Sequence, residues 1–435
     1  MGKEHISAVW KKYSDVVVER AEGAYIFAAD GRRYLDFTSG IGVTNTGHCH
    51  PKVVAAARDQ VGKLIHGEAN LVYHKPMLDL TDELLAVVPP GFDTFFFGNS
   101  GAEAVEGALK MARQVSSRPA VIAFQGAFHG RTMGALSLTT SKAMYRAHYS
   151  PLLAGVYHTP YPYCYRCPLA GTLAAPSAVE PPHAPAGCGL KWCLGQLEYL
   201  LATQVVPADV AAIIFEPVLG EGGYVAPPVE FARALRRLCD EHGIFLIMDE
   251  VQAGIGRTGR FFAHEHYGIR PDIITMAKGL ASGLPLSCIA APRAIMGRWA
   301  PGSHGTTFGG NAVSCAAAVA TLRAIRDEGM VANAAQMGSA LLDGLLGLKA
   351  RDAGIGDIRG LGLMLAAEFV AADGSPDAAR SHEILHECSE RGLLLLACGV
   401  YDNAIRFVPP LIVSREQVQE ALAIFAAALQ AVPRS

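Results

Sequence analysis

The stretch that most constrains the fold is residues 244–280, in which two short apolar runs each end in a charged residue. Residues 244–248 read IFLIM and residues 273–277 read IITMA, and runs of this length and composition predict buried strands of an α/β sheet. Asp249 follows the first run and Lys278 follows the second. Ligands of open α/β sheets bind beyond the carboxyl ends of the strands, so we expect both charges to face one crevice.

A carboxylate and an amine in one crevice suit the chemistry of pyridoxal phosphate. The lysine would form a Schiff base, and the carboxylate would keep the pyridine nitrogen protonated so that the ring withdraws electrons. Two other interpretations are open at this point. The two charges could form an ordinary ion pair, and Gly254, Gly256 and Gly259 spell the G-x-G-x-x-G pattern of a dinucleotide-binding loop. The residues that follow these glycines lack the small, apolar periodicity of a Rossmann helix, which disfavours a nicotinamide cofactor.

Composition narrows the class of protein. The 435 residues can bury a core large enough for two domains. A content of 51% hydrophobic and 18% charged residues indicates a globular enzyme rather than a disordered chain. The formal net charge of −3 provides no basic surface for nucleic acid. No apolar run approaches the length of a membrane span and the first residues show no signal core, so we expect no membrane partner and a cytoplasmic location.

Between residues 94 and 278 the order strand, helix, strand repeats, which predicts a mostly parallel sheet covered by helices on both faces. We therefore predict a large α/β domain over residues 50–312. Residues 313–435 alternate helices with short strands and predict a smaller α+β domain. The N-terminal segment, residues 1–49, is assigned to this smaller domain.

Loops that follow the predicted strands offer binding groups. Ser100 and Gly101 precede a helical pattern, where free N–H groups and the helix dipole favour an anion such as a phosphate. Phe128 is a candidate to stack on a flat ring with His129 beside it. Arg131 is a candidate to bind a substrate carboxylate. Each also has an ordinary structural interpretation, as a helix cap, as core packing or as a brace for a loop.

Seven motifs carry a resemblance to a known family: NSGAEAVE, GAFHGRT, FEPVLGEGG, MDEVQAGIGRTG, AKGL, GTTFGGN and GDIRGLGLM. In order and spacing they resemble the class III (ω-) aminotransferases, most of all the 4-aminobutyrate aminotransferases, over nearly the whole chain. The resemblance implies the pyridoxal-phosphate-dependent transferase fold of the aspartate aminotransferase type. It also implies a homodimer or a dimer of dimers.

The resemblance further implies roles for individual residues. Lys278 would carry the cofactor and shuttle the substrate proton, and Asp249 would pair with the pyridine nitrogen. Glu216 and Arg406 match a gate in this family. Arg406 would bind the α-carboxylate of the substrate glutamate, or turn to Glu216 when the incoming amine has no carboxylate at that position. Arg131 would hold the distal carboxylate of an ω-amino acid. The other implied contacts are Ser100, Gly101 and Ala102 at the phosphate, Phe128, His129, Val251 and Gln252 around the ring, Thr307 from a neighbouring subunit, and Ile41 at the substrate.

These residues predict a transaminase that moves an amino group from an ω-amino acid or a primary amine to a 2-oxo acid, 2-oxoglutarate or pyruvate, in two half-reactions. The alternative is an amino-acid racemase or epimerase on the same scaffold, because it would use the same lysine and cofactor. A non-catalytic regulator built on this fold is disfavoured by the intact pair of Lys278 and Asp249.

One segment departs from the family pattern. Residues 161–193 form a proline-rich insertion that contains Cys164, Cys167, Cys188 and Cys193. A C-x2-C followed by a C-x4-C resembles a structural zinc or iron–sulfur site. The second spacing is wider than usual, so a reduced, metal-free loop is the favoured interpretation.

Overall fold

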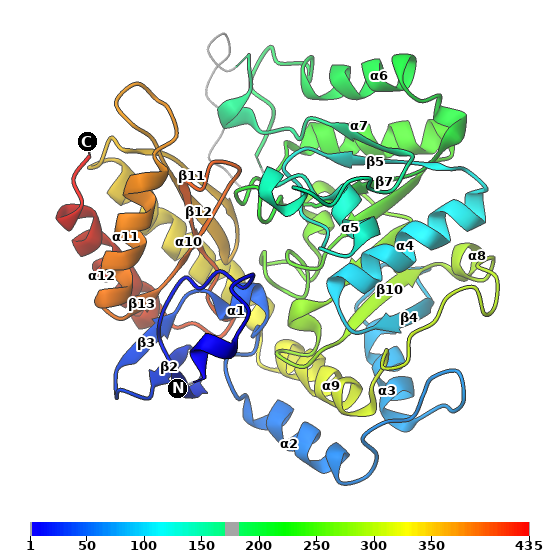
Figure 1. Cartoon of the computed structure of the whole chain (residues 1–435), viewed down its shortest axis with the longest axis horizontal. Coiled ribbons are helices and arrows are strands. Elements are labelled where there is room, and N and C mark those ends of the chain that lie inside the picture. The colour runs from blue at the N-terminus through cyan, green and yellow to red at the C-terminus, as the bar shows by residue number, and fades with distance from the viewer. Residues whose placement is uncertain (1, 170–181, 435) are drawn as a thin grey trace.

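The computed structural model describes residues 2–169 and 182–434, and a seven-stranded sheet in the order β4-β10-β9-β8-β7-β5-β6 forms its centre (Figure 1). The strands from β9 to β6 pair in parallel, and β10 runs antiparallel to both β4 and β9. The predicted α/β fold with a mostly parallel sheet is confirmed. The strands are β4 Thr94–Gly98, β5 Ala120–Phe124, β6 Val156–Thr159, β7 Val210–Phe215, β8 Phe245–Asp249, β9 Ile273–Met276 and β10 Ser287–Ala291.

Alternate side chains of the central strands enter two cores, one on each face of the sheet. Ile122 and Ile213 pack with helices α6 and α7, whereas Val121 and Ile214 pack with α4 and α5. Because helices cover both faces, these strands read as continuous apolar runs rather than as alternating patterns. The helices are α4 Gly101–Ser116, α5 Met133–Leu138, α6 Cys193–Thr203, α7 Val229–His242 and α8 Arg293–Met296.

Two four-stranded sheets lie beside the central sheet, on the left in Figure 1. One has the order β1-β2-β3-β13, and β13 pairs in parallel with β3, so N-terminal strands share a sheet with the C-terminal part of the chain. The other is antiparallel with the order β11-β12-β15-β14. The shared sheet supports the assignment of residues 1–49 to the smaller domain, although the domain boundaries stay predictions. The strands are β1 Val18–Glu22, β2 Tyr25–Ala28, β3 Arg33–Asp36, β11 Ile355–Leu361, β12 Met364–Phe369, β13 Leu393–Leu394, β14 Leu396–Cys398 and β15 Ala404–Phe407.

The remaining helices cover these sheets and join the two parts of the chain. Helices α10, α11 and α12 pack on the two smaller sheets and on one another, and α2 and α3 pack on α9. None of the helices in the described ranges has both the length and the apolarity needed to cross a bilayer. Their bounds are α1 Ser39–Gly42, α2 Pro51–Val61, α3 Lys75–Leu85, α9 Ala312–Asp327, α10 Met330–Lys349, α11 Ala378–Glu390 and α12 Arg415–Ala431.

The sheet order brings several functional candidates to one edge. Asp249 is the last residue of β8, Lys278 lies two residues beyond β9, and Glu216 directly follows β7. Helix α4 begins three residues after β4. Parallel strands end at the same edge, so these groups meet although they lie far apart in the sequence.

Candidate active site

A cavity of about 430 Å³ lies at the carboxyl ends of the central strands. It is also lined by Glu221, which was not predicted from the sequence, whereas Ile41, Thr307 and Arg406 are not among its lining residues. The predicted residues that it brings together are Ser100, Gly101, Ala102, Phe128, His129, Arg131, Glu216, Asp249, Val251, Gln252 and Lys278.

Asp249 is buried and held on three sides. Its Oδ2 lies 2.7 Å from Nδ1 of His129. Its Oδ1 accepts hydrogen bonds from the Val251 N–H and the Thr275 hydroxyl, each at 3.1 Å. Burial alone would lower the pKa of His129, but the hydrogen bond and charge of Asp249 outweigh it and raise that pKa above its ordinary value. The carboxylate is therefore fixed in position by an imidazole, a main-chain N–H group and a hydroxyl.

Lys278 lines the cavity and has a constrained backbone conformation. Its φ of 42° is in the left-handed region, which is uncommon for a residue with a side chain and recurs at functional sites. The next residue has no room for a side chain, because a Cβ on Gly279 would lie 2.3 Å from the amide nitrogen of Asn45. Burial lowers the pKa of the Lys278 amine to about 8, although the charge of Glu221 opposes the shift. A lowered pKa makes the neutral, nucleophilic amine accessible near physiological pH.

The N-terminus of helix α4 forms another wall of the cavity. The Ser100 hydroxyl caps the helix by accepting the N–H of Glu103 at 3.3 Å. The N–H groups of Gly101 and Ala102 belong to the first turn, which has no acceptor within a helix. A Cβ on Gly101 would lie 2.7 Å from Cγ1 of Val251, so the glycine lets this wall approach the loop after β8. The arrangement suits an anion held by main-chain N–H groups.

The similarity to known proteins covers nearly the whole chain and not only the residues of the cavity. A family model described as aminotransferase class III matches residues 6–429. The chain belongs to the class III aminotransferases. It is 41% identical to the 5-aminovalerate aminotransferase DavT of Pseudomonas aeruginosa and 40% identical to the 4-aminobutyrate aminotransferase GabT of Escherichia coli K12, in each case over 94% of this chain and 92% of the relative. A solved amine transaminase from an uncultivated Pseudomonas species has a TM-score of 0.87 at 32% identity, covering 96% of this chain and 95% of that one.

This class III aminotransferase is therefore a transaminase, and its cofactor is pyridoxal 5′-phosphate, as predicted. The cavity fits that group. The buried side-chain oxygen of Gln252 has no partner among the described residues, which suits a polar substituent of a ring. Lys278 would hold the aldehyde carbon and Asp249 the pyridine nitrogen. The start of α4 would hold the phosphate. These individual assignments stay predictions.

The predicted pairing of Glu216 with Arg406 is wrong in this aminotransferase. Nη1 of Arg406, on β15, lies 2.5 Å from Oε1 of Glu221. Glu216 instead accepts the N–H groups of Phe128 at 2.8 Å and of Gly220 at 2.9 Å. Glu216 directly follows β7 and is bound to the Phe128 loop, whereas the turn that follows carries Glu221 across to the small-domain strand.

The two glutamates also differ in electrostatics. Burial raises the pKa of Glu216 to about 7. Burial would raise the pKa of Glu221 as well, but the charge and hydrogen bond of Arg406 outweigh it and lower that pKa below its usual value. Both glutamates belong to the motif FEPVLGEGG, and the only sequence signal for the second one is its position between the glycines of a turn.

Arg131, unlike Arg406, contacts aromatic rings and none of the carboxylates that the structure describes. Its guanidinium carbon is 4.2 Å from the ring centroid of Tyr145 and 5.9 Å from that of Phe128. Among the described residues no carboxylate lies within ion-pair distance of Arg131. Nothing in the sequence singled out Tyr145, which lies between predicted elements.

Two predicted residues lie outside the cavity. Ile41 is half-buried and has a φ of 68°, a strained conformation for a β-branched residue. Thr307 is exposed, and the neighbouring Thr306 hydroxyl accepts a hydrogen bond from the Asn99 amide at 3.1 Å. Their roles stay predictions.

The G-x-G-x-x-G pattern serves packing between the two parts of the chain. A Cβ on Gly256 would lie 3.0 Å from Cδ1 of Leu411, and one on Gly259 would lie 2.9 Å from the Cβ of Ala335 in α10. These glycines do not line the cavity. The nicotinamide alternative has no support from this loop.

The metal interpretation of the insertion also lacks support. Among the described residues no group of three or more His, Cys, Asp or Glu side chains is arranged to hold a metal ion, and residues 170–181 of the insertion lie outside the described residues. Burial and the neighbouring cysteines raise the pKa of Cys164 to about 12 and that of Cys193 to about 11. All four insertion cysteines, including Cys167 and Cys188, are free thiols.

Proposed function

We propose that the enzyme transfers the amino group of an ω-amino acid, such as 4-aminobutyrate or 5-aminovalerate, to 2-oxoglutarate in a ping-pong cycle. The observation that carries this proposal is the different state of two arginines. Arg406 is buried and paired with Glu221, whereas Arg131 faces the cavity without a carboxylate partner among the described residues. The charge of Arg406 is therefore compensated within the protein, whereas Arg131 can bind a carboxylate of the substrate.

This arrangement lets one cavity accept two unlike substrates. In the ω-amino acid half-reaction, Arg131 binds the distal carboxylate and Glu221 keeps the Arg406 charge compensated. In the 2-oxoglutarate half-reaction, Arg406 leaves Glu221 and binds the carboxylate next to the reacting carbon. Burying an unpaired guanidinium would cost several kcal/mol, so a resident carboxylate is needed whenever the substrate does not bring one.

Lys278 and Asp249 handle the substrate proton and the charge of the cofactor ring. When bound, the cofactor ring supplies an electron sink for the charge left at the substrate carbon after its proton is removed. Lys278 removes that proton and returns it, and its lowered pKa suits a base that works near neutral pH. Asp249, fixed by His129, supplies the negative charge opposite the pyridine nitrogen.

We also retain the homodimer as part of the proposal, with Thr307 reaching the phosphate of the second subunit. Thr307 is exposed in the chain and its neighbour Phe308 is exposed too, together with Leu71 and Tyr73. Exposed apolar side chains of this size are typical of an interface. A cytoplasmic location is likewise proposed, because all ten cysteines are free thiols.

The test is a visible absorption spectrum of the holoenzyme. We expect 4-aminobutyrate or 5-aminovalerate to bleach the cofactor band and 2-oxoglutarate to restore it. Alanine and a simple primary amine serve as comparison donors. If an α-amino acid loses optical purity while the band persists, and no ω-amino acid bleaches it, the enzyme is a racemase and the proposal fails.

A further inference from the structure

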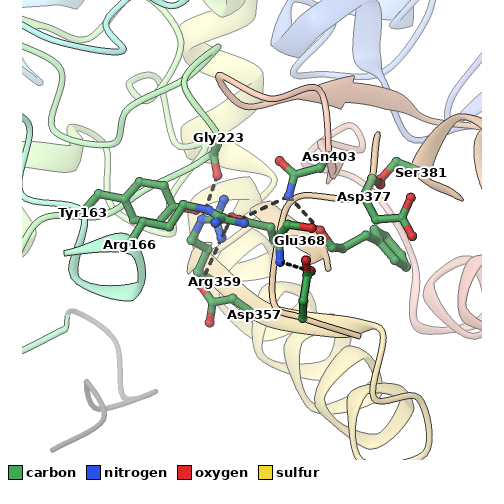
Figure 2. Close-up of polar contacts among 12 residues, drawn as sticks. Tyr163, Arg166, Gly223, Asp357, Arg359, Glu368, Asp377, Ser381 and Asn403 are labelled. Atoms are coloured by element: carbon green, nitrogen blue, oxygen red, sulfur yellow. Dashed lines mark hydrogen bonds and ion pairs between the residues drawn. The ribbon is translucent and has the colours of Figure 1, made fainter. Parts of the chain in front are cut away.

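A cluster of buried charges joins the cysteine-rich insertion to the smaller domain. At its centre is Glu368 on β12, with 1% of its surface exposed. Figure 2 shows Arg359 from β11 and Tyr163 and Arg166 from the insertion converging on this carboxylate. Nη1 of Arg359 lies 2.7 Å from Oε2 of Glu368, and Nε of Arg166 lies 2.5 Å from Oε1. The Tyr163 hydroxyl donates a hydrogen bond to Oε2.

The charges in this cluster depend on one another. Burial alone would raise the pKa of Glu368, but Arg359, Tyr163 and Arg166 together outweigh it and lower that pKa. Arg359 is also paired with Asp357 at 3.0 Å, and its guanidinium lies 4.8 Å from the Tyr163 ring centroid. Loss of any one partner leaves the others buried with incomplete compensation.

Arg359 extends the cluster to the turn that carries Glu221. Its Nε donates a hydrogen bond of 2.8 Å to the carbonyl oxygen of Gly223, two residues beyond Glu221 (Figure 2). The carbonyl oxygen of Glu221 itself accepts the Gly399 N–H at 2.9 Å. A Cβ on Gly223 would lie 2.9 Å from Nη2 of Arg359, so the turn approaches the guanidinium as closely as a glycine allows.

The same sheet also carries Arg406, the partner of Glu221, on strand β15. In the β12–β15 pairing, Ala366 lies opposite Arg406, and Ala366 is two residues from Glu368 on the same strand. Glu368 therefore lies beside the strand that bears Arg406 and, through Arg359, holds the turn that bears Glu221. The turn that bears Glu221 is therefore hydrogen-bonded to the cluster, and Arg406 lies on the strand that pairs with the strand of Glu368.

We propose that Tyr163 and Arg166 of the insertion are positioning residues that determine substrate specificity by fixing Arg359, through Glu368, against the Glu221 turn. This inference rests on the proposed function, in which Glu221 masks Arg406 during the ω-amino acid half-reaction. A loosened cluster lets Glu221 release Arg406 more readily. The half-reaction that needs the pair closed then slows, and dicarboxylates, which need it open, bind more tightly.

The test uses the holoenzyme and a matched pair of substitutions in one loop. Y163F removes the hydroxyl bound to Glu368, and R166Q removes the positive charge that Arg166 places beside Glu368. Y165F is the control, because the Tyr165 hydroxyl packs near Gly356 and has no hydrogen-bond partner among the described residues. Single-turnover absorbance gives kcat/KM separately for the 4-aminobutyrate and the 2-oxoglutarate half-reactions.

We expect Y163F and R166Q to lower the ratio of kcat/KM for 4-aminobutyrate to kcat/KM for 2-oxoglutarate by about tenfold. A factor of this size corresponds to the loss of one hydrogen bond to a charged group. Y165F should leave that ratio unchanged. In an E221Q background the effect of Y163F should disappear, because the residue through which it acts is already altered. Equal losses in both half-reactions, or the same Y163F effect with and without Glu221, would show a merely structural role and overturn the inference.

A binding measurement separates this inference from the proposed function. Glutarate, a dicarboxylate without an amino or oxo group, should bind Y163F about tenfold more tightly than Y165F, as measured by the shift of the cofactor band. If no ω-amino acid reacts with the wild type, the proposed function fails, and tighter glutarate binding to Y163F still supports the inference. Equal glutarate affinity in Y163F and Y165F refutes it.

Discussion

Replacing Glu221 by glutamine tests the central feature of the site. The Arg406 side chain is 4% exposed, and its Nη1 lies 2.5 Å from the Glu221 carboxylate, so water compensates its charge little. Glutamine keeps an oxygen that can accept a hydrogen bond but removes the negative charge. The loss should therefore be that of a charge-assisted hydrogen bond, about 1.5–3 kcal/mol, rather than the larger cost of an unpaired buried ion. That range corresponds to about 10- to 150-fold in kcat/KM.

The loss should fall on one half-reaction. With 4-aminobutyrate the substrate brings no carboxylate to Arg406, so E221Q should slow bleaching of the cofactor band by the factor above. With 2-oxoglutarate the substrate supplies the carboxylate, so restoration of the band should be unchanged or faster. E216Q is the matched comparison, because Glu216 is bound to the Phe128 N–H and not to Arg406, and it should affect both half-reactions alike. Equal loss in both half-reactions for E221Q, or selectivity in E216Q, would refute the assignment of the pair.

Three further predictions concern the cavity. Lys278→Ala should abolish turnover while thermal unfolding shows an intact fold, and near-normal activity would contradict the assignment of this residue. Because burial lowers the pKa of Lys278 from 10.5 to about 8, covalent uptake of pyridoxal phosphate by the cofactor-free enzyme should rise with pH and level off above about 8, and a rate that still climbs towards pH 10 would argue against the shift. Arg131→Met should raise KM for 4-aminobutyrate by about 10- to 100-fold, from the loss of a charged hydrogen bond, and should leave KM for a simple primary amine unchanged.

The parts of this structure that sequence predicts well are those governed by local pattern. Buried parallel strands appear as short apolar runs, and the rule that ligands bind beyond their carboxyl ends predicted that Asp249 and Lys278 share one crevice, where the structure places them. The pairing of Glu216 with Arg406 came from the family resemblance, and it took the first glutamate of the motif FEPVLGEGG. The partner of Arg406 is the second glutamate, five residues further, in a turn whose path is set by contacts with another part of the chain.

Contacts between distant segments have no local signature, and they decide the remaining features of the site. Tyr145 meets Arg131 only because the chain after α5 folds back towards the loop that precedes this helix. Gly223 is fixed by Arg359, which lies 136 positions along the chain. In a sequence without the structure, these residues are an ordinary tyrosine and an ordinary arginine, and only packing gives them a role.

The burial of Glu368 depends on residues of the insertion. A glutamate in the strand MLAAEF would be destabilising if it were buried alone, because desolvating a carboxylate costs several kcal/mol. Its burial is tolerated because Arg359, Arg166 and Tyr163 compensate it, and two of these three come from the insertion. The insertion and the buried glutamate therefore form one unit. We therefore infer that the cysteine-rich segment acts through Tyr163 and Arg166 rather than through its thiols. These two side chains connect the segment, by way of Glu368 and Arg359, to the turn that bears Glu221.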